Sequence, residues 1–143
     1  MDYRQGTHSI YALKYHIVFC TKYRYRILTG EVATRTRELI QEICASHYVD
    51  ILSGGMNTDH VHLLLSAPPN LSVSKIIQYI KGKSSRKLLQ EFGSLRKRCW
   101  GQHLWASGYF AVSVGNVNSQ EVQKYIEEQE EHHRSEDFRI TET

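Results

Sequence analysis

The sequence predicts an α+β fold of the ferredoxin-like type: an antiparallel βαββαβ sheet with helices on one face, followed by a C-terminal helix. Residues 9–20, 48–53, 59–65 and 109–114 have the composition and alternation of strands. Amphipathic helical patterns occupy residues 30–46 and 73–92 between them. This order of elements is the one found in ferredoxin-like proteins. The 143 residues, 41% hydrophobic and 23% charged, are typical of a single globular domain spanning 1–143.

The first strand and the first helix follow directly from local patterns. Residues 9–20 alternate, so one face of the predicted strand is apolar, formed by Tyr11, Leu13, Tyr15, Ile17 and Phe19. Thr29 is a candidate N-cap for the helix at 30–46, and Glu31 lies in its first turn, where an acid is favourable.

The strand at 59–65 carries the first candidate site. Residues two apart in a strand share a face, so His60 and His62 lie together while Val61, Leu63 and Leu65 point into a core. Two neutral imidazoles are half of a divalent metal site. Eight histidines in this chain would produce roughly 0.4 such pairs by chance, so the pair alone does not establish a metal site.

The second helix, at 73–92 with Ser72 as N-cap, begins a strongly basic segment. Residues 81–98 hold seven bases and one acid, Glu91, which is more charge than solvation requires and indicates a nucleic-acid backbone as partner. A second basic stretch, 21–26, has tyrosines between its bases; it is either a solvated strand end or a site of phosphate contact and base stacking. The predicted DNA-binding residues are Lys22, Arg24, Arg26, Lys81, Lys83, Arg86, Lys87, Arg96, Lys97 and Arg98.

Charge is unevenly distributed along the chain. Residues 121–137 contain seven acids and two bases, a net charge of −5, while the whole chain carries +3, so the remainder carries +8. Such asymmetry indicates a basic body that meets a polyanion.

The last predicted helix covers about residues 118–133 and is followed by a tail at 136–143. Tyr125 and Gln129 are four residues apart and therefore share one face of this helix. Taken alone, that pair is better explained by a core tyrosine, in a stripe with Val122 and Ile126, and a solvated glutamine.

Several classes of protein are disfavoured. No apolar run approaches the roughly 20 residues that span a bilayer, and the N-terminus has no signal region, so a cytoplasmic protein is expected. The three cysteines are widely spaced, which argues against a disulfide framework or a cysteine zinc site. Gly82-Lys83-Ser84 resembles the end of a P-loop, but Ile77 stands where that motif requires glycine.

Together the motifs resemble those of a known family. Asp59-His60-Val61-His62 followed by Tyr125-x-x-x-Gln129 resembles the single-tyrosine HUH transposases of small prokaryotic insertion sequences (TnpA type, the insertion sequence two-hundred/six-oh-five group). The resemblance extends over nearly the whole chain and includes residues 15–24, the Lys81-Gly82 helix and Trp105-x-x-Gly108-Tyr109-Phe110. Thr58 is one departure, because a proline is expected before the Asp-His pair.

The resemblance implies a metal-dependent DNA transposase. His60, His62 and Gln129 would bind Mg²⁺ or Mn²⁺, and Tyr125 would be the nucleophile that cleaves single-stranded DNA and forms a 5′-phosphotyrosine link. The implied partners are DNA hairpins at transposon ends and a second copy of the chain, whose tyrosine helix can complete the site.

Three other interpretations stay open from the residues. The protein could be a domesticated relative that acts on repeat hairpins, a non-catalytic ferredoxin-like nucleic-acid-binding module, or a small metal-binding protein that uses the H-x-H pair. The aromatic RNA-binding signature of ferredoxin-like sheets is absent from the sequence, which counts against the non-catalytic nucleic-acid-binding module.

Overall fold

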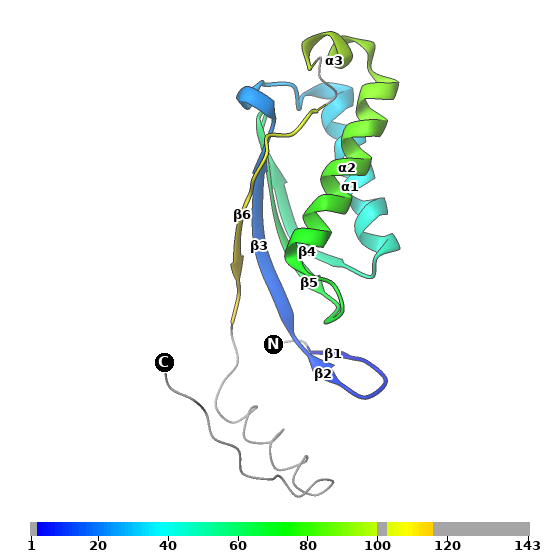
Figure 1. Cartoon of the computed structure of the whole chain (residues 1–143), viewed down its shortest axis with the longest axis vertical. Coiled ribbons are helices and arrows are strands. Elements are labelled where there is room, and N and C mark those ends of the chain that lie inside the picture. The colour runs from blue at the N-terminus through cyan, green and yellow to red at the C-terminus, as the bar shows by residue number, and fades with distance from the viewer. Residues whose placement is uncertain (1–2, 100–102, 116–143) are drawn as a thin grey trace, which may run out of the picture. The chain divides into compact units, whose positions relative to one another are not determined.

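The structure, a computed structural model, describes residues 3–99 and 103–115, and the chain up to Val114 forms one compact unit, Asp2–Val114. Its main sheet has the strand order β4-β5-β3-β6, and every neighbouring pair is antiparallel. The strands are β3 (Leu13–Cys20), β4 (Asp50–Met56), β5 (His60–Ala67) and β6 (Phe110–Ser113). Helices α1 (Gly30–Ser46) and α2 (Val73–Glu91) pack side by side on one face of this sheet (Figure 1). This arrangement confirms the predicted ferredoxin-like βαββαβ fold.

Both helices begin where the sequence predicts. The Ser72 hydroxyl accepts a hydrogen bond of 3.2 Å from the Lys75 amide, which caps the start of α2. Thr29 has the extended backbone of an N-cap before α1, but its side chain makes no capping hydrogen bond. Each helix turns an apolar stripe to the sheet, and the buried hydrophobic residues of the two stripes are Ala33, Leu39, Ile40, Ile43, Cys44, Ile76, Ile77, Ile80, Leu88 and Leu89.

The sheet separates a buried face from an outer face. Ile17 and Phe19 of β3 pack against the helices, as do the alternate residues Val61, Leu63 and Leu65 of β5, and all five are at most 5% exposed. The predicted anchoring of the histidine strand in the core is therefore confirmed. Because β5 pairs with β3 on one side and β4 on the other, the strand that carries the histidines is central.

Some elements differ from the prediction. The strand expected at 48–53 extends instead over β4, because Gly54 and Gly55, which resemble turn residues in sequence, are paired with β5. A short helix, α3 (Gly93–Arg98), and an N-terminal hairpin of β1 (Arg4–Gln5) and β2 (Ile10–Tyr11) were not predicted. The predicted helix at about 118–133 lies outside the described residues.

Two further observations concern the class of protein. Cys20, Cys44 and Cys99 are all free thiols. Among residues 3–99 and 103–115, none of the helices has the length and apolarity needed to cross a membrane.

Candidate functional site

His60 and His62 lie on the sheet face that is turned away from the helices, as predicted. Their ring centroids are 6.4 Å apart and the rings are tilted by 35°. Imidazole–metal bonds are about 2.1 Å long, so two rings that share one ion have centroids roughly 5 to 6 Å apart. The observed separation is longer than this range, so the two rings would have to approach each other to share one ion.

Neighbouring polar groups fix the orientation of the His60 ring. Its Nδ1 donates to the Asp59 carboxylate at 2.8 Å, and the Asn57 side-chain amide approaches Nε2 at 3.1 Å. With the proton on Nδ1, the lone pair of Nε2 accepts a hydrogen bond from the Asn57 amide, so a metal ion at Nε2 would displace Asn57. A carboxylate bonded to the second ring nitrogen is the usual arrangement around metal-ligating histidines. The hydrogen bond from His60 and, to a smaller extent, the charge of Arg24 also lower the pKa of Asp59.

Gly55 lies beneath the His62 ring. The two residues are cross-strand partners of β4 and β5, and a Cβ at Gly55 would overlap His62 Nε2 and lie 2.6 Å from its Cε1 atom. Only a residue without a side chain therefore lets the ring rest against the backbone of β4. This close contact places the second imidazole beside the first.

The residues present fit a divalent metal ion, but they form only part of its ligand set. Neutral imidazoles are common ligands of divalent transition-metal ions, and the carboxylate behind His60 raises its basicity. Within residues 3–99 and 103–115, there is no group of three or more His, Cys, Asp or Glu side chains that could hold a metal. Tyr125 and Gln129, the predicted nucleophile and third ligand, lie outside the described residues.

The ten predicted DNA-binding side chains are all at least partly accessible to solvent. Glu91, the one acid in the segment 81–98, is bound by Arg35 of α1, whose Nε and Nη2 donate to its two oxygens at 2.8 and 3.1 Å. Because this carboxylate is already neutralised from another helix, it offsets little of the surrounding positive charge. The basic surface formed by residues 81–98 is thus available to a polyanion.

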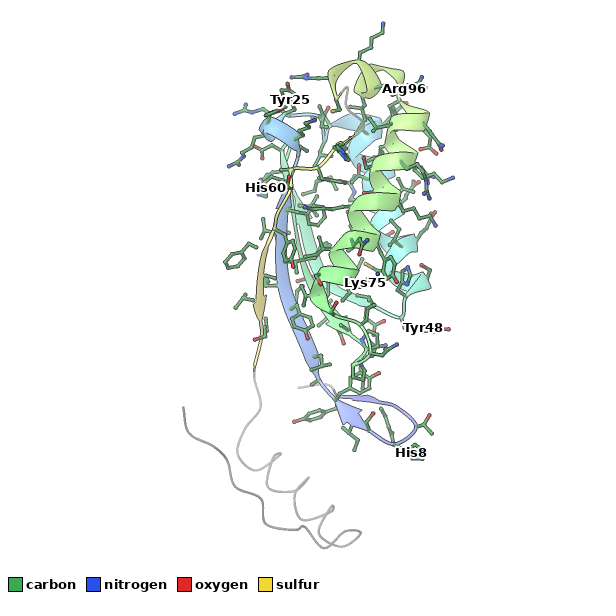
Figure 2. The ribbon with its side chains drawn as sticks, in the orientation of Figure 1. His8, Tyr25, Tyr48, His60, Lys75 and Arg96 are labelled. Atoms are coloured by element: carbon green, nitrogen blue, oxygen red, sulfur yellow. The ribbon has the colours of Figure 1, made fainter. Side chains whose placement is uncertain are left out.

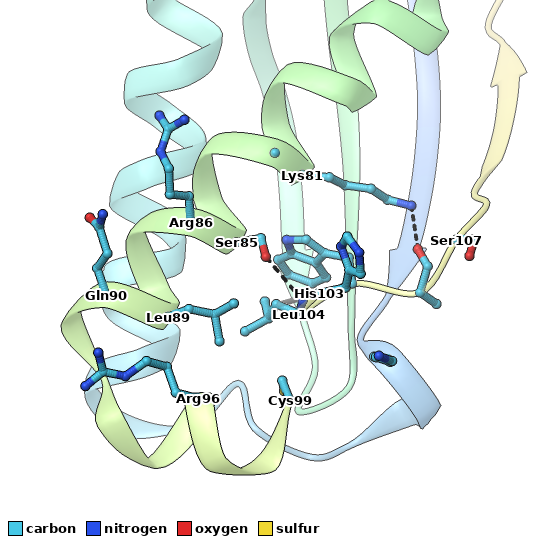
Figure 3. Close-up of a pocket in the computed structure, with 14 residues that line it drawn as sticks. Lys81, Ser85, Arg86, Leu89, Gln90, Arg96, Cys99, His103, Leu104 and Ser107 are labelled. Atoms are coloured by element: carbon cyan, nitrogen blue, oxygen red, sulfur yellow. Dashed lines mark hydrogen bonds between the residues drawn. The ribbon is translucent and has the colours of Figure 1, made fainter. Parts of the chain in front are cut away.

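Part of this surface opens into a cavity of about 1210 Å³ between α2, α3 and residues 103–107 (Figure 3). Four cationic residues line it, and none of its described lining residues is acidic; neither His60 nor His62 is among them. The cationic residues are Lys22, Lys81, Arg86 and Arg96. The cavity and the histidine pair are separate features.

Lys81 has an intramolecular role that its sequence context did not predict. Its ammonium group donates to the backbone carbonyls of Ala106 and Gly108 at 2.8 and 2.6 Å, which fastens the segment before β6 to α2. Partial burial lowers the pKa of this amine. Lys81 therefore helps to shape the cavity, and its contact with DNA stays a prediction.

Arg24 also has a protein partner. Its guanidinium binds Asp59 with Nε and Nη2 at 3.2 and 3.1 Å from Oδ2, beside His60, and its contact with DNA stays a prediction. His60 lies at the start of β5, close to the turn that carries Tyr25 (Figure 2). The contacts of Arg24 with Asp59 and of Gly55 with His62 were not predicted because each joins different segments of the chain, whereas Asp59 and His60 are neighbours in sequence.

Comparison with known proteins identifies the family. The family model described as "Transposase IS200 like" matches residues 9–129. The chain belongs to the IS200-like transposase family. The ISDra2 transposase TnpA of Deinococcus radiodurans is 33% identical over 129 residues, covering 90% of this chain and 92% of the relative. The transposase for insertion sequence element IS200 of Salmonella typhimurium is 37% identical over 128 residues, covering 90% and 84%.

Solved structures agree with this assignment. A crystal structure assigned to a transposase from Deinococcus radiodurans superimposes with a TM-score of 0.72 at 31% identity, covering 88% of this transposase and 97% of that chain. A REP-associated tyrosine transposase bound to a REP hairpin has a TM-score of 0.54 at 13% identity, covering 87% and 68%, and this likeness concerns the fold alone. The predicted family, fold and transposase function are confirmed.

Proposed function

We propose that this transposase cleaves and rejoins single-stranded DNA at the ends of its insertion sequence through a 5′-phosphotyrosine at Tyr125, with Mg²⁺ or Mn²⁺ held by His60, His62 and Gln129. The observation that carries the proposal is the histidine pair on the outer face of the sheet. His60 is bonded through Nδ1 to Asp59, which makes Nε2 the ligating atom once a metal ion displaces the Asn57 amide.

In the proposed cleavage step, Tyr125 is the nucleophile and the metal ligands support the phosphate. The Tyr125 hydroxyl attacks the scissile phosphorus, a bond forms between Tyr125 Oη and phosphorus, and the bond from phosphorus to the 3′ oxygen breaks. The phenol loses its proton and the departing 3′ oxygen gains one. A divalent ion, when bound, polarises the phosphate and stabilises its developing charge. The phosphotyrosine keeps the energy of the original bond for rejoining, so no nucleotide hydrolysis is needed.

The basic surface of residues 81–98 would hold the DNA backbone. Phosphate contacts of this kind give affinity and register without reading sequence. Arg86 and Arg96 line the cavity and have no acidic partner among the described residues, so they are the strongest candidates for direct phosphate contacts. We propose hairpins at the transposon ends as the form of DNA bound.

The homodimer predicted from the sequence has a candidate surface in β6. This strand is at the edge of the sheet within the described residues, and Phe110 and Val112 are 61% and 47% exposed. Exposed edge strands pair readily with another chain. Phe110→Asp should therefore shift a dimer to monomer in light scattering, whereas Tyr48→Asp, at another exposed aromatic residue, should not; dimers that persist in Phe110→Asp would exclude this surface.

The decisive experiment combines the protein with labelled single-stranded element ends and Mg²⁺ or Mn²⁺. A covalent protein–DNA adduct that survives denaturation is expected from the wild type and from the control Tyr48→Phe, but not from Tyr125→Phe or His60→Ala. An adduct formed by Tyr125→Phe would remove the nucleophile assignment. Cleavage of repeat hairpins but not of element ends would instead identify a domesticated relative.

A further inference from the structure

The short turn η1 (Lys22–Arg24) has an unusual backbone. Tyr23 and Arg24 both have φ of 55°, in the left-handed region that residues with a Cβ rarely occupy. Two such residues in succession persist only where the surrounding structure holds them.

Hydrogen bonds tie this turn to the segment before the histidine strand. Thr21 is fully buried; its amide donates to the Asp59 carbonyl at 2.9 Å, and its hydroxyl donates to the Tyr25 carbonyl at 2.7 Å. The amide of Leu28 donates to the Thr58 carbonyl at 3.0 Å. The strained turn is thus anchored on both sides, next to the residues that precede His60.

The result is a chain of three side chains that ends at the histidine. Arg24 Nε donates to Asp59 Oδ2 at 3.2 Å and its Nη2 lies 3.1 Å from the same oxygen in an ion pair, while Asp59 Oδ1 accepts from His60 Nδ1 at 2.8 Å. Each carboxylate oxygen has its own partner, so the carboxylate cannot rotate without breaking a contact. The Asp59 side chain is only 17% exposed, whereas that of Arg24 is 65% exposed, so water competes for the guanidinium more than for the carboxylate.

We propose that Arg24 is a positioning residue of the metal centre. By holding Asp59 Oδ2, it keeps Oδ1 on His60 Nδ1 and so keeps His60 Nε2 free of a proton and correctly aimed for a divalent ion. The inference rests on the proposed metal-binding role of His60, and it gives Arg24 a function other than the phosphate contact predicted from its sequence context.

The two roles of Arg24 are separable because only one of them requires DNA. Arg26 provides the matched control: it has the same charge, is exposed, lies two residues away and has no described partner. Both arginines can contact phosphate, but only Arg24 reaches Asp59. A measurement made without DNA therefore isolates the positioning role.

The first test measures Mn²⁺ binding to the full-length protein in the absence of DNA. Electron paramagnetic resonance detects the Mn²⁺ that remains free. Loss of a direct outer contact to a metal-ligating histidine typically weakens metal affinity by about 10- to 100-fold; because Arg24 acts through Asp59, we expect a loss at the lower end, about tenfold. We expect that loss from Arg24→Gln, a smaller loss from Arg24→Lys, and none from Arg26→Gln. Wild-type affinity in Arg24→Gln, or an equal loss in Arg26→Gln, would overturn the inference.

A second test needs neither metal nor DNA. Nitrogen-15 shifts of the His60 ring should show the proton on Nδ1 in the wild type and in Arg26→Gln, and a mixture of tautomers in Arg24→Gln. An unchanged tautomer in Arg24→Gln would refute the positioning role. If the wild type binds no Mn²⁺, the metal assignment in the proposed function fails, and the tautomer measurement still decides whether Arg24 orients His60.

Discussion

Gly55→Ala should damage catalysis while leaving the fold intact. The new methyl group would overlap His62 Nε2 and lie 2.6 Å from Cε1, whereas van der Waals contact begins near 3.4 Å, so the ring must withdraw by more than about 0.8 Å. His62 is exposed and can move, and alanine is intrinsically favoured over glycine in a strand, so stability should change by less than about 1 kcal/mol. A misplacement of about 1 Å in an active site costs up to about 10²-fold in rate.

The assay is single-turnover formation of the covalent DNA adduct, measured beside thermal unfolding. Gly54→Ala is the matched control, because its methyl group points to the other face and meets Leu63 Cδ2 at 2.9 Å. That variant should lose about 1 kcal/mol of stability through overpacking but cleave at the wild-type rate once folded. Adduct formation by Gly55→Ala at the wild-type rate would show that the position of the His62 ring does not govern the reaction.

Three further outcomes are expected. Trp105→Phe removes a buried indole donor and should lower the free energy of unfolding by about 2 kcal/mol in urea denaturation. Arg86→Gln with Arg96→Gln should weaken single-stranded DNA binding and reduce the slope of log affinity against log salt by about 1 per lost phosphate contact, whereas Arg37→Gln on α1 should change neither. Ion pairing lowers the pKa of Glu91, so its stabilisation is present above its usual pKa of 4.5 and lost as acid protonates it; Glu91→Gln should flatten that part of the stability–pH curve in acid titrations.

The sequence was sufficient to predict the order of strands and helices, because local hydrophobic periodicity determines which segments form each element. Alternation in a strand has a period of two, so once Val61, Leu63 and Leu65 are assigned to the core, His60 and His62 must face outward. The helix boundaries were likewise predictable from caps and apolar stripes, and both helices begin at the predicted residues. The strand at β4 was harder to delimit, because its paired glycines have the composition of a turn.

The contacts that orient the site could not be predicted because they join residues far apart in the chain. Arg24 reaches Asp59 across 35 positions, and Lys81 reaches Gly108 across 27. In the sequence, Arg24 and Lys81 look like the other basic residues around them. Only the folded backbone shows which basic side chains bind within the protein and which are exposed to solvent. Gly55 is a similar case, since its contact with His62 depends on the register of two strands.

The central position of β5 bears on how the site behaves when the molecule fluctuates. Strands that are hydrogen-bonded along both edges exchange their amide hydrogens last, whereas short peripheral elements open often. The backbone of His60 and His62 therefore belongs to the most protected part of the described chain, while the two-residue strands of the N-terminal hairpin can open and close without disturbing it. Separation of His60 from His62 should require disruption of the whole sheet, so the arrangement of the two histidines should persist while peripheral elements open and close.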